Sequence, residues 1–302
     1  MYGAILGDIM GSSYEGHPIK TKEFPLFSDI WQNPVIDPAT GFISRGTSTF
    51  TDDTTMTIAV ADGMMLFIRD KYPNLISDRD KFKRIKSDDF EEDKLSQLSD
   101  YFVKNMVFWG KKYPNVGYGG RFRKWLSYEP KPYNSWGNGS AMRVSPVGWM
   151  FEDIETTRKI AAIQSAVSHN HPEGVKGAEA VASAIFLARE GSSKNDIREY
   201  VAKEFDYDMN RTCDEIRPTY EFDVSAQGSV PESIIAFLDS EDFEDAIRNA
   251  ISLGGDTDTM GAMAGSIAEA YYGVPEELKS EAENRIPEMM KKTLIQFRDW
   301  WM

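Results

Sequence analysis

Cysteine is almost absent from this sequence, because Cys213 is the single one among 302 residues. One cysteine cannot form an intramolecular disulfide, which excludes the disulfide-stapled secreted domains and favours a reducing compartment. Long apolar runs are also missing, since no stretch approaches the roughly 18 consecutive apolar residues of a membrane helix. The first residues carry no positive charge and reach Asp8 early, unlike a secretory signal peptide. We therefore expect a soluble, cytoplasmic protein.

Positive charge is scarce as well. Lysine and arginine number 34 against 48 aspartates and glutamates, and the formal net charge is −14. Long-range repulsion then opposes encounter with nucleic acid or an anionic membrane, so we expect neither as a partner. A small anionic ligand stays compatible, because it needs only a local pocket rich in hydrogen-bond donors. The hydrophobic content of 41% is ordinary for a folded globular chain, and we expect a monomer.

Apolar residues recur at helical spacing along most of the chain, and no alternating strand–helix pattern and no fixed-period repeat is present. The fold predicted is all-α, in a single compact multi-helix domain over residues 1–302. Gly3, Gly7 and Gly11 recur every four residues in an apolar segment, a spacing that suits a helix packed close to a neighbour. The predicted helices cover residues 52–70, 156–168, 173–189, 194–205, 230–238, 242–253, 256–272, 275–284 and 287–301.

Three stretches lack a clear helical pattern. Residues 17–50 contain four prolines and little periodicity, and a connection of that length is more often a functional loop than filler. Residues 74–100 are dense in charge, which is typical of a solvated connection or helix face. Residues 113–143 mix glycines with aromatic residues, which can hold a nucleotide diphosphate through backbone N–H groups and stacking. They match no Walker or dinucleotide turn, and we expect plain turns there.

Two acidic stretches are the strongest candidates for chemistry. Thr51-Asp52-Asp53-Thr54 and Gly254-Gly255-Asp256-Thr257-Asp258-Thr259 each place two carboxylates and flanking hydroxyls at a predicted helix start. Such hard oxygen ligands suit Mg²⁺, Mn²⁺ or Ca²⁺, and the absence of Cys and His argues against zinc. If the fold unites the stretches, their carboxylates repel unless cations neutralise them, which indicates a two-metal site. Two unrelated capped helices remain the alternative.

Other polar residues have weaker support. Asp8 is either a buried carboxylate with a structural partner or a group that supports the metal ligands. Glu15, taken alone, is an exposed loop acid. His169 and His171 are two residues apart in a loop with no third soft ligand, which is a poor zinc signature. We expect one of them to bind or stack on a ligand and the other to be structural. His17 completes no set.

Five motifs together resemble the ADP-ribosylglycohydrolases, a family that includes the dinitrogenase reductase-activating glycohydrolase. The resemblance runs from about Gly3 to Tyr272. In order, the motifs are Gly7-Asp8 with Glu15, Thr51-Asp52-Asp53-Thr54, Gly137-Asn138-Gly139-Ser140-Ala141-Met142-Arg143, Ser168-His169-Asn170-His171-Pro172 and the second acidic stretch. Ser168 stands where the family often has threonine.

The resemblance implies a compact all-α fold with two Mg²⁺ or Mn²⁺ ions in a central binuclear cleft. It implies metal ligation by Thr51, Asp52, Asp53, Asp256, Asp258 and Thr259. It also implies that Glu15 gates or assists the site, and that the loops around Gly119, Gly139, Ser140 and His169 hold ADP-ribose.

The function predicted is hydrolysis of the bond to ribose C1″ of an ADP-ribosylated protein or small ADP-ribose conjugate. Asp53 and Asp256 are the candidates for the catalytic base, with Glu15 as a further catalytic carboxylate. Another metal-dependent nucleotide hydrolase and a non-catalytic ADP-ribose binder are the alternatives. A relative that has lost its catalytic activity should also have lost some of the metal-binding acids, whereas all four aspartates remain. The linkage that is cleaved and the choice between Mg²⁺ and Mn²⁺ stay open.

Overall fold

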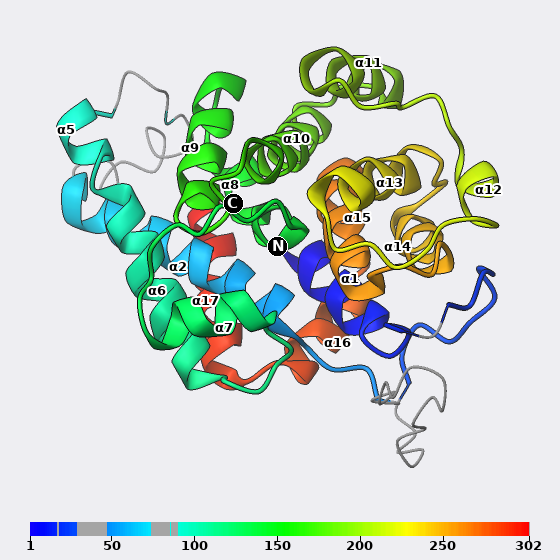
Figure 1. The fold of residues 1–302 in the computed structure, drawn as a ribbon, viewed down its shortest axis with the longest axis horizontal. Coiled ribbons are helices and arrows are strands. Elements are labelled where there is room, and N and C mark those ends of the chain that lie inside the picture. Colours follow the sequence, from blue (N-terminus) through cyan, green and yellow to red (C-terminus); the bar gives the residue numbers. More distant parts are fainter. Residues whose placement is uncertain (17, 29–46, 74–84, 86–89, 302) are drawn as a thin grey trace.

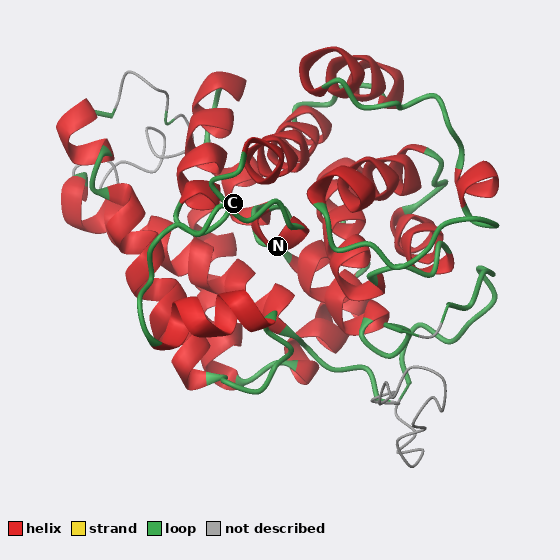
Figure 2. Ribbon diagram, viewed as in Figure 1, coloured by secondary structure: helices red, strands yellow, loops and turns green. Residues whose placement is uncertain are grey.

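Helices make up the regular secondary structure of the chain. The computed structural model describes residues 1–16, 18–28, 47–73, 85 and 90–301, and over these ranges it has no strand beyond an isolated bridge between Gly137 and Ser225. Figure 2 shows this all-helical architecture, which confirms the predicted fold class. The helices are α1 Tyr2–Gly11, α2 Asp52–Lys71, α5 Glu92–Leu95, α6 Leu98–Lys112, α7 Gly120–Ser127, η2 Asn138–Ser140, α8 Ser145–Met150, α9 Ile154–Ala166, α10 Pro172–Arg189, α11 Lys194–Phe205, α12 Cys213–Ile216, α13 Ala226–Leu238, α14 Phe243–Ser252, α15 Thr257–Tyr272, α16 Glu276–Arg285 and α17 Glu288–Trp301.

The contact between α1 and α15 lies at the centre of the molecule, where the two helices run side by side (Figure 1). Every residue of α1 is buried. The glycines of α1 allow backbone to meet backbone: a Cβ added at Gly7 would lie 2.0 Å from the carbonyl oxygen of Gly261, and one at Gly3 would lie 2.0 Å from that of Gly265. The four-residue glycine spacing therefore serves close helix packing, as predicted.

Other helices enclose this central pair. On one side, α10, α13 and α14 pack against α15. On the other, α2 packs against α1 and in turn contacts α6 and α17 (Figure 1). Because α1, α2 and α15 meet in the middle, the end of the first and the starts of the other two fall close together.

Predicted helices and observed helices agree to within a few residues at most ends, because the capping side chains sit where the sequence placed them. Thr51 caps α2 by accepting a hydrogen bond from the Asp53 N–H at 3.2 Å. The largest shift of a predicted end is in α13, which begins at Ala226 with Ser225 as its cap, and not at Val230; Pro231 lies inside it. Helix α6, Leu98–Lys112, has no counterpart among the predicted helices.

The expectation of plain turns over residues 113–143 was wrong for α7. The glycines at positions 119 and 120 hide its start, but Phe122, Trp125 and Leu126 follow at helical spacing and are all buried. Residues 138–140 form the short 3₁₀ turn η2. Much of the charged stretch 74–100 and of the loop 17–50, including His17, lies outside the described residues.

No helix among the described residues has the length and apolar character required to cross a membrane.

The crossing of α1 and α15 predicts a specific sensitivity. Gly7→Ala forces a methyl group into the Gly261 carbonyl, so we expect the free energy of unfolding to fall by at least about 1–3 kcal/mol. Gly120→Ala is the matched control, because a Cβ there meets nothing within 4 Å and should change stability by less than about 1 kcal/mol. Urea unfolding followed by circular dichroism measures both. Equal midpoints for the two variants would contradict the tight crossing.

Candidate active site

A cavity of about 430 Å³ opens where the loop after α1 meets the starts of α2, α7 and α15. Acidic residues line one part of it, and glycines, aromatic residues and two arginines line the rest. The cavity brings together nearly all residues predicted for the site, far apart as they are in the chain. Those that line it are Glu15, Thr51, Asp52, Asp53, Gly119, Gly139, His169, Asp256, Asp258 and Thr259.

Asp8 lies behind the cavity and fixes the start of α2. Its carboxylate accepts hydrogen bonds from the N–H groups of Thr51 and Thr54 at 2.9 and 3.0 Å. It also accepts from both threonine hydroxyls, that of Thr51 at 2.8 Å. Asp8 is fully buried and has structural partners, and one of those partners, Thr51, lines the cavity. Both interpretations of Asp8 therefore describe the same role, which is to hold the first acidic stretch in place.

Asp53 links the two acidic stretches across the cavity. One of its oxygens, Oδ2, accepts hydrogen bonds from the hydroxyls of Thr51 and Thr259, each at 3.3 Å. The other oxygen, Oδ1, is buried and accepts no hydrogen bond from the residues that the structure describes. A buried carboxylate oxygen without a donor is costly unless a ligand or cation occupies the space in front of it.

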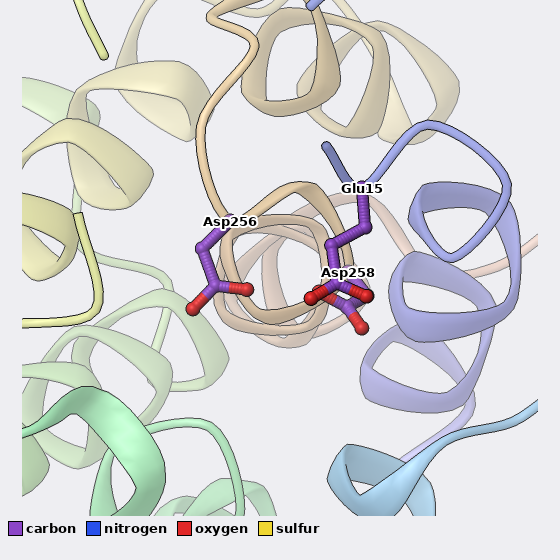
Figure 3. Close-up of side chains that lie close together, drawn as sticks. All are labelled: Glu15, Asp256 and Asp258. Atoms are coloured by element: carbon purple, nitrogen blue, oxygen red, sulfur yellow. The ribbon is translucent and has the colours of Figure 1, made fainter. Parts of the chain in front are cut away.

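Glu15, Asp256 and Asp258 form the tightest acidic group in the cavity. Each offers one oxygen, and these oxygens lie within 4.8 Å of one another. Figure 3 shows the three carboxylates converging from the loop after α1 and from the start of α15. Asn138 orients one member of this metal-binding candidate by donating from Nδ2 to Oδ2 of Asp256 at 2.8 Å. Asp52 and Asp53 line the same cavity outside this group.

Burial and mutual repulsion raise the pKa values of the acids in the site. Burial, followed by the charge of Asp258, raises the pKa of Asp52, Asp53 and Asp256 well above the ordinary value of an aspartate. The same two causes raise the pKa of Asp8 to about 7. No lysine or arginine hydrogen-bonds to these carboxylates in the described part of the chain. An all-oxygen donor set with an unsatisfied buried oxygen and excess negative charge fits hard divalent cations.

The other half of the cavity has a different character. Gly119 and Gly120 leave open space beside their backbone, since an added Cβ would meet no atom within 4 Å. Gly139 packs on His169, whose Nε2 would lie 3.0 Å from a Cβ at that position. Burial, and then the charge of Arg143, lowers the pKa of His169 well below its ordinary value, so the ring is neutral at neutral pH. A neutral ring beside open backbone is suited to a flat or polar ligand group.

Two predicted residues have other surroundings. The hydroxyl of Ser140 is buried and donates to the carbonyl of Gly174 at 2.9 Å, and this residue is not among those lining the cavity. His171 caps α10, where its Nδ1 accepts from the N–H of Glu173 at 3.2 Å. His169 thus lines the cavity while His171 caps a helix. Ligand binding by His169 stays a prediction.

Sequence reasoning missed Asn138 and Arg143 as site residues, although both lie in the quoted glycine-rich motif. Arg143 is fully buried, and its guanidinium donates to Gln164 at 2.9 Å and to Ser168 at 3.0 Å. Burial lowers its pKa to about 10, so it keeps its charge at neutral pH. Among the described residues this buried cation has no carboxylate partner, and it lines the cavity. The cavity therefore combines a group of acids with a buried positive charge.

Comparison with known proteins identifies the group to which such a site belongs. A family model described as ADP-ribosylglycohydrolase matches residues 1–301. The chain belongs to the ADP-ribosylglycohydrolase family. The ADP-ribosylhydrolase ARH3 of Homo sapiens is 28% identical, with 93% of this chain and 87% of that protein covered. ARH3 of Gallus gallus is also 28% identical, with coverages of 90% and 83%.

Two further relatives of this ADP-ribosylglycohydrolase extend the comparison. An uncharacterized protein of Escherichia coli, YegU, is 27% identical, with 91% of this chain and 86% of that protein covered. A solved structure described as an ADP-ribosylglycohydrolase-related protein complex covers 100% of this chain and 99% of its own, with a TM-score of 0.60 and 19% identity. That likeness shows the fold. Family membership confirms the resemblance of the five motifs, and the protein is a hydrolase of this type.

The raised pKa values predict an unusual pH dependence of stability. Because the folded pKa of Asp8, about 7, exceeds its ordinary value of 3.8, the folded state binds more protons than the unfolded state between those values. Stability from such a group is lost as pH rises through the folded pKa. We therefore expect the cation-free protein to unfold at a higher urea concentration at pH 7 than at pH 8.

Saturating Mg²⁺ provides the control for this measurement. A bound cation favours the ionised carboxylates, so the gain in stability on lowering the pH should shrink or reverse, and the stabilisation by Mg²⁺ should be larger at pH 8. The buried His169 opposes the trend, because its folded pKa is lowered, and its effect fades as the pH rises above its ordinary value of 6.5. If chelator-treated protein is as stable at pH 8 as at pH 7, the raised pKa values of the site acids are contradicted.

Proposed function

We propose that this protein hydrolyses the bond to C1″ of the distal ribose in an ADP-ribosyl compound and releases free ADP-ribose. The observation that carries the proposal is one cavity lined both by the acids of α2 and α15 with Glu15 and by glycines and arginines that offer hydrogen-bond donors. The names of the ARH3 relatives, ADP-ribosylhydrolases, support the same substrate class. The compound is an ADP-ribosylated protein side chain or a small ADP-ribose conjugate.

The acidic end would hold two divalent cations, Mg²⁺ or Mn²⁺, through Thr51, Asp52, Asp53, Asp256, Asp258 and Thr259. When bound, such cations supply charge stabilisation and orientation for the ribose hydroxyls and for a water molecule. The chain prepares this end in two ways. Asp8 fixes the start of α2 through Thr51, and Asn138 turns the carboxylate of Asp256.

Hydrolysis requires a proton acceptor beside the anomeric carbon. A water oxygen bonds to C1″ while the bond from C1″ to the leaving group breaks, and the proton that the water loses passes to a carboxylate. The leaving group departs with the bonding electron pair and takes up a proton from solvent. Asp53 and Asp256 are the candidates for that acceptor, since both are buried carboxylates that line the cavity. Glu15, at the rim of the acidic group, is the further candidate and can also stabilise the positive charge that develops on the ribose.

The opposite half of the cavity suits the ADP part of the substrate. Gly119 leaves open space beside its backbone, the neutral ring of His169 lies against Gly139, and Arg143 supplies positive charge. A diphosphate is therefore compatible with this pocket although the whole chain carries a net charge of −14.

A substrate panel with two variants tests the proposal. Purified protein is incubated with arginine-linked, serine-linked and acetyl-ester ADP-ribosyl compounds in the presence of Mg²⁺ or Mn²⁺, and free ADP-ribose is quantified. We expect release from at least one compound, abolition by chelator, and a loss of at least about 100-fold in kcat for Asp53→Asn and Asp256→Asn. Glu277→Gln, an exposed acid on α16, is the matched control and should keep full activity.

Product analysis gives the outcomes that would contradict the proposal. Release of inorganic phosphate or AMP without ADP-ribose would indicate a nucleotide phosphohydrolase. Activity that survives both aspartate substitutions would remove the role assigned to the acidic end. A pH–rate profile whose acidic limb disappears in only one of the two variants would identify the proton acceptor.

A further inference from the structure

A second cavity of about 470 Å³ lies beside the active site, between the loop before α13 and helix α12. Phe222 lines both cavities and so stands at the boundary between them. Tyr220 lines the second cavity, and its ring packs on Gly255, the residue immediately before Asp256. Its Cε1 would lie 2.3 Å from a Cβ at that glycine. A residue that lines the second cavity therefore contacts the loop that leads into α15.

Acidic side chains dominate this second cavity. Glu215, Glu221, Asp223 and Glu232 line it against a single cationic residue, Arg211. The ammonium of Lys20 lies nearby and donates to the carbonyls of Tyr220 and Leu253; with its charge counted, the four carboxylates still outnumber the two cations. The cavity consequently carries excess negative charge and is placed to accept a cationic group.

Glu232 shows that this charge is not fully satisfied within the protein. Its side chain is 7% exposed, and Oε1 accepts from Arg211 at 2.8 Å. Oε2 is buried and accepts no hydrogen bond from the described residues. Burial raises the pKa of Glu232, and the charge of Asp223 raises it further. Because Glu232 lines the cavity, its carboxylate keeps acceptor capacity for a donor that enters from outside.

The surface between the two cavities is apolar and exposed. Trp136, Phe222 and Val224 are 49%, 50% and 46% exposed and line the mouth of the active-site cavity. Large apolar side chains grouped at the mouth of a site are typical of a surface that contacts another molecule. A polypeptide attached to the ribose at C1″ would leave the active site over this rim and reach the acidic cavity.

We infer that the cavity formed by Glu215, Glu221, Asp223 and Glu232 binds a basic side chain, lysine or arginine, that flanks the modified residue of an ADP-ribosylated polypeptide. The inference rests on the proposed function and narrows its substrate class from ADP-ribosyl compounds in general to polypeptides with a basic sequence around the modification. The flanking ammonium or guanidinium donates to the free oxygen of Glu232, and its apolar stem packs on Phe222.

Matched peptides provide the test. Arginine-linked and serine-linked ADP-ribosyl peptides are prepared in pairs that differ only in flanking residues, lysine in one and norleucine in the other. For wild-type protein we expect kcat/KM to be about two- to fivefold higher for the lysine peptide, as for a partly exposed ion pair. The preference should decrease as salt is raised, because exposed charges are screened.

Two variants connect this preference with the cavity. Glu221→Gln removes an exposed charge, and Glu232→Gln removes the buried one while keeping an acceptor for Arg211; each should bring the ratio of the two kcat/KM values toward one. Glu277→Gln, far from the cavity in α16, should leave the ratio unchanged. Circular dichroism melts confirm that each variant is folded.

The outcomes separate this inference from the proposed function. Equal kcat/KM for both peptides in wild-type protein, or a preference that both variants retain, overturns the basic-side-chain site while hydrolysis itself stands. If no peptide and no small compound releases ADP-ribose, the proposed function fails and this inference fails with it. A preference for the lysine peptide that is lost in Glu221→Gln and Glu232→Gln alone supports the assignment.

Discussion

The close crossing of α1 and α15 is the constraint on which the rest of the structure depends. At this crossing backbone meets backbone, because glycines on both helices remove the side chains that would separate them. The hydroxyl of Thr257 donates to the carbonyl of Gly11 at 2.9 Å and fixes the register where one helix ends and the other begins. That register decides how far Glu15 lies from Asp256 and Asp258, and hence whether three carboxylates can meet.

Around this crossing the protein accumulates negative charge that it does not neutralise itself. Asp8, Asp53, Asp256 and Asp258 are all buried, and neighbouring carboxylates raise the pKa values of the first three. An isolated buried ion is expensive, so such an arrangement persists in a stable fold only when hydrogen bonds or cations offset it. Hydrogen bonds do so for Asp8, which accepts four of them, whereas one oxygen of Asp53 is left without any.

Helix positions were largely predictable from sequence, because apolar spacing and caps such as Thr51 are local signals. The start of α7 was not, since glycines conceal it, and α13 starts at its cap Ser225, more than one turn before Pro231. The acidic residues of the candidate site were predictable as two clusters. The partnership of Asn138 with Asp256 was not, because these side chains meet only through the tertiary fold. The acidic cavity beside Phe222 joins Glu215 of α12 and Glu232 of α13 with the loop between these helices, and such a meeting gives no local sequence signal.

The pairing of the first helix with one near the other end of the sequence has a consequence for synthesis. About 250 residues separate Gly7 from Gly261, and at translation rates of about 5–20 residues per second the apolar helix α1 waits roughly 10–50 s for its partner. During that time a segment that is buried on every side in the finished protein has no surface to cover it. The nascent chain therefore depends on chaperone binding or transient collapse until α15 emerges from the ribosome.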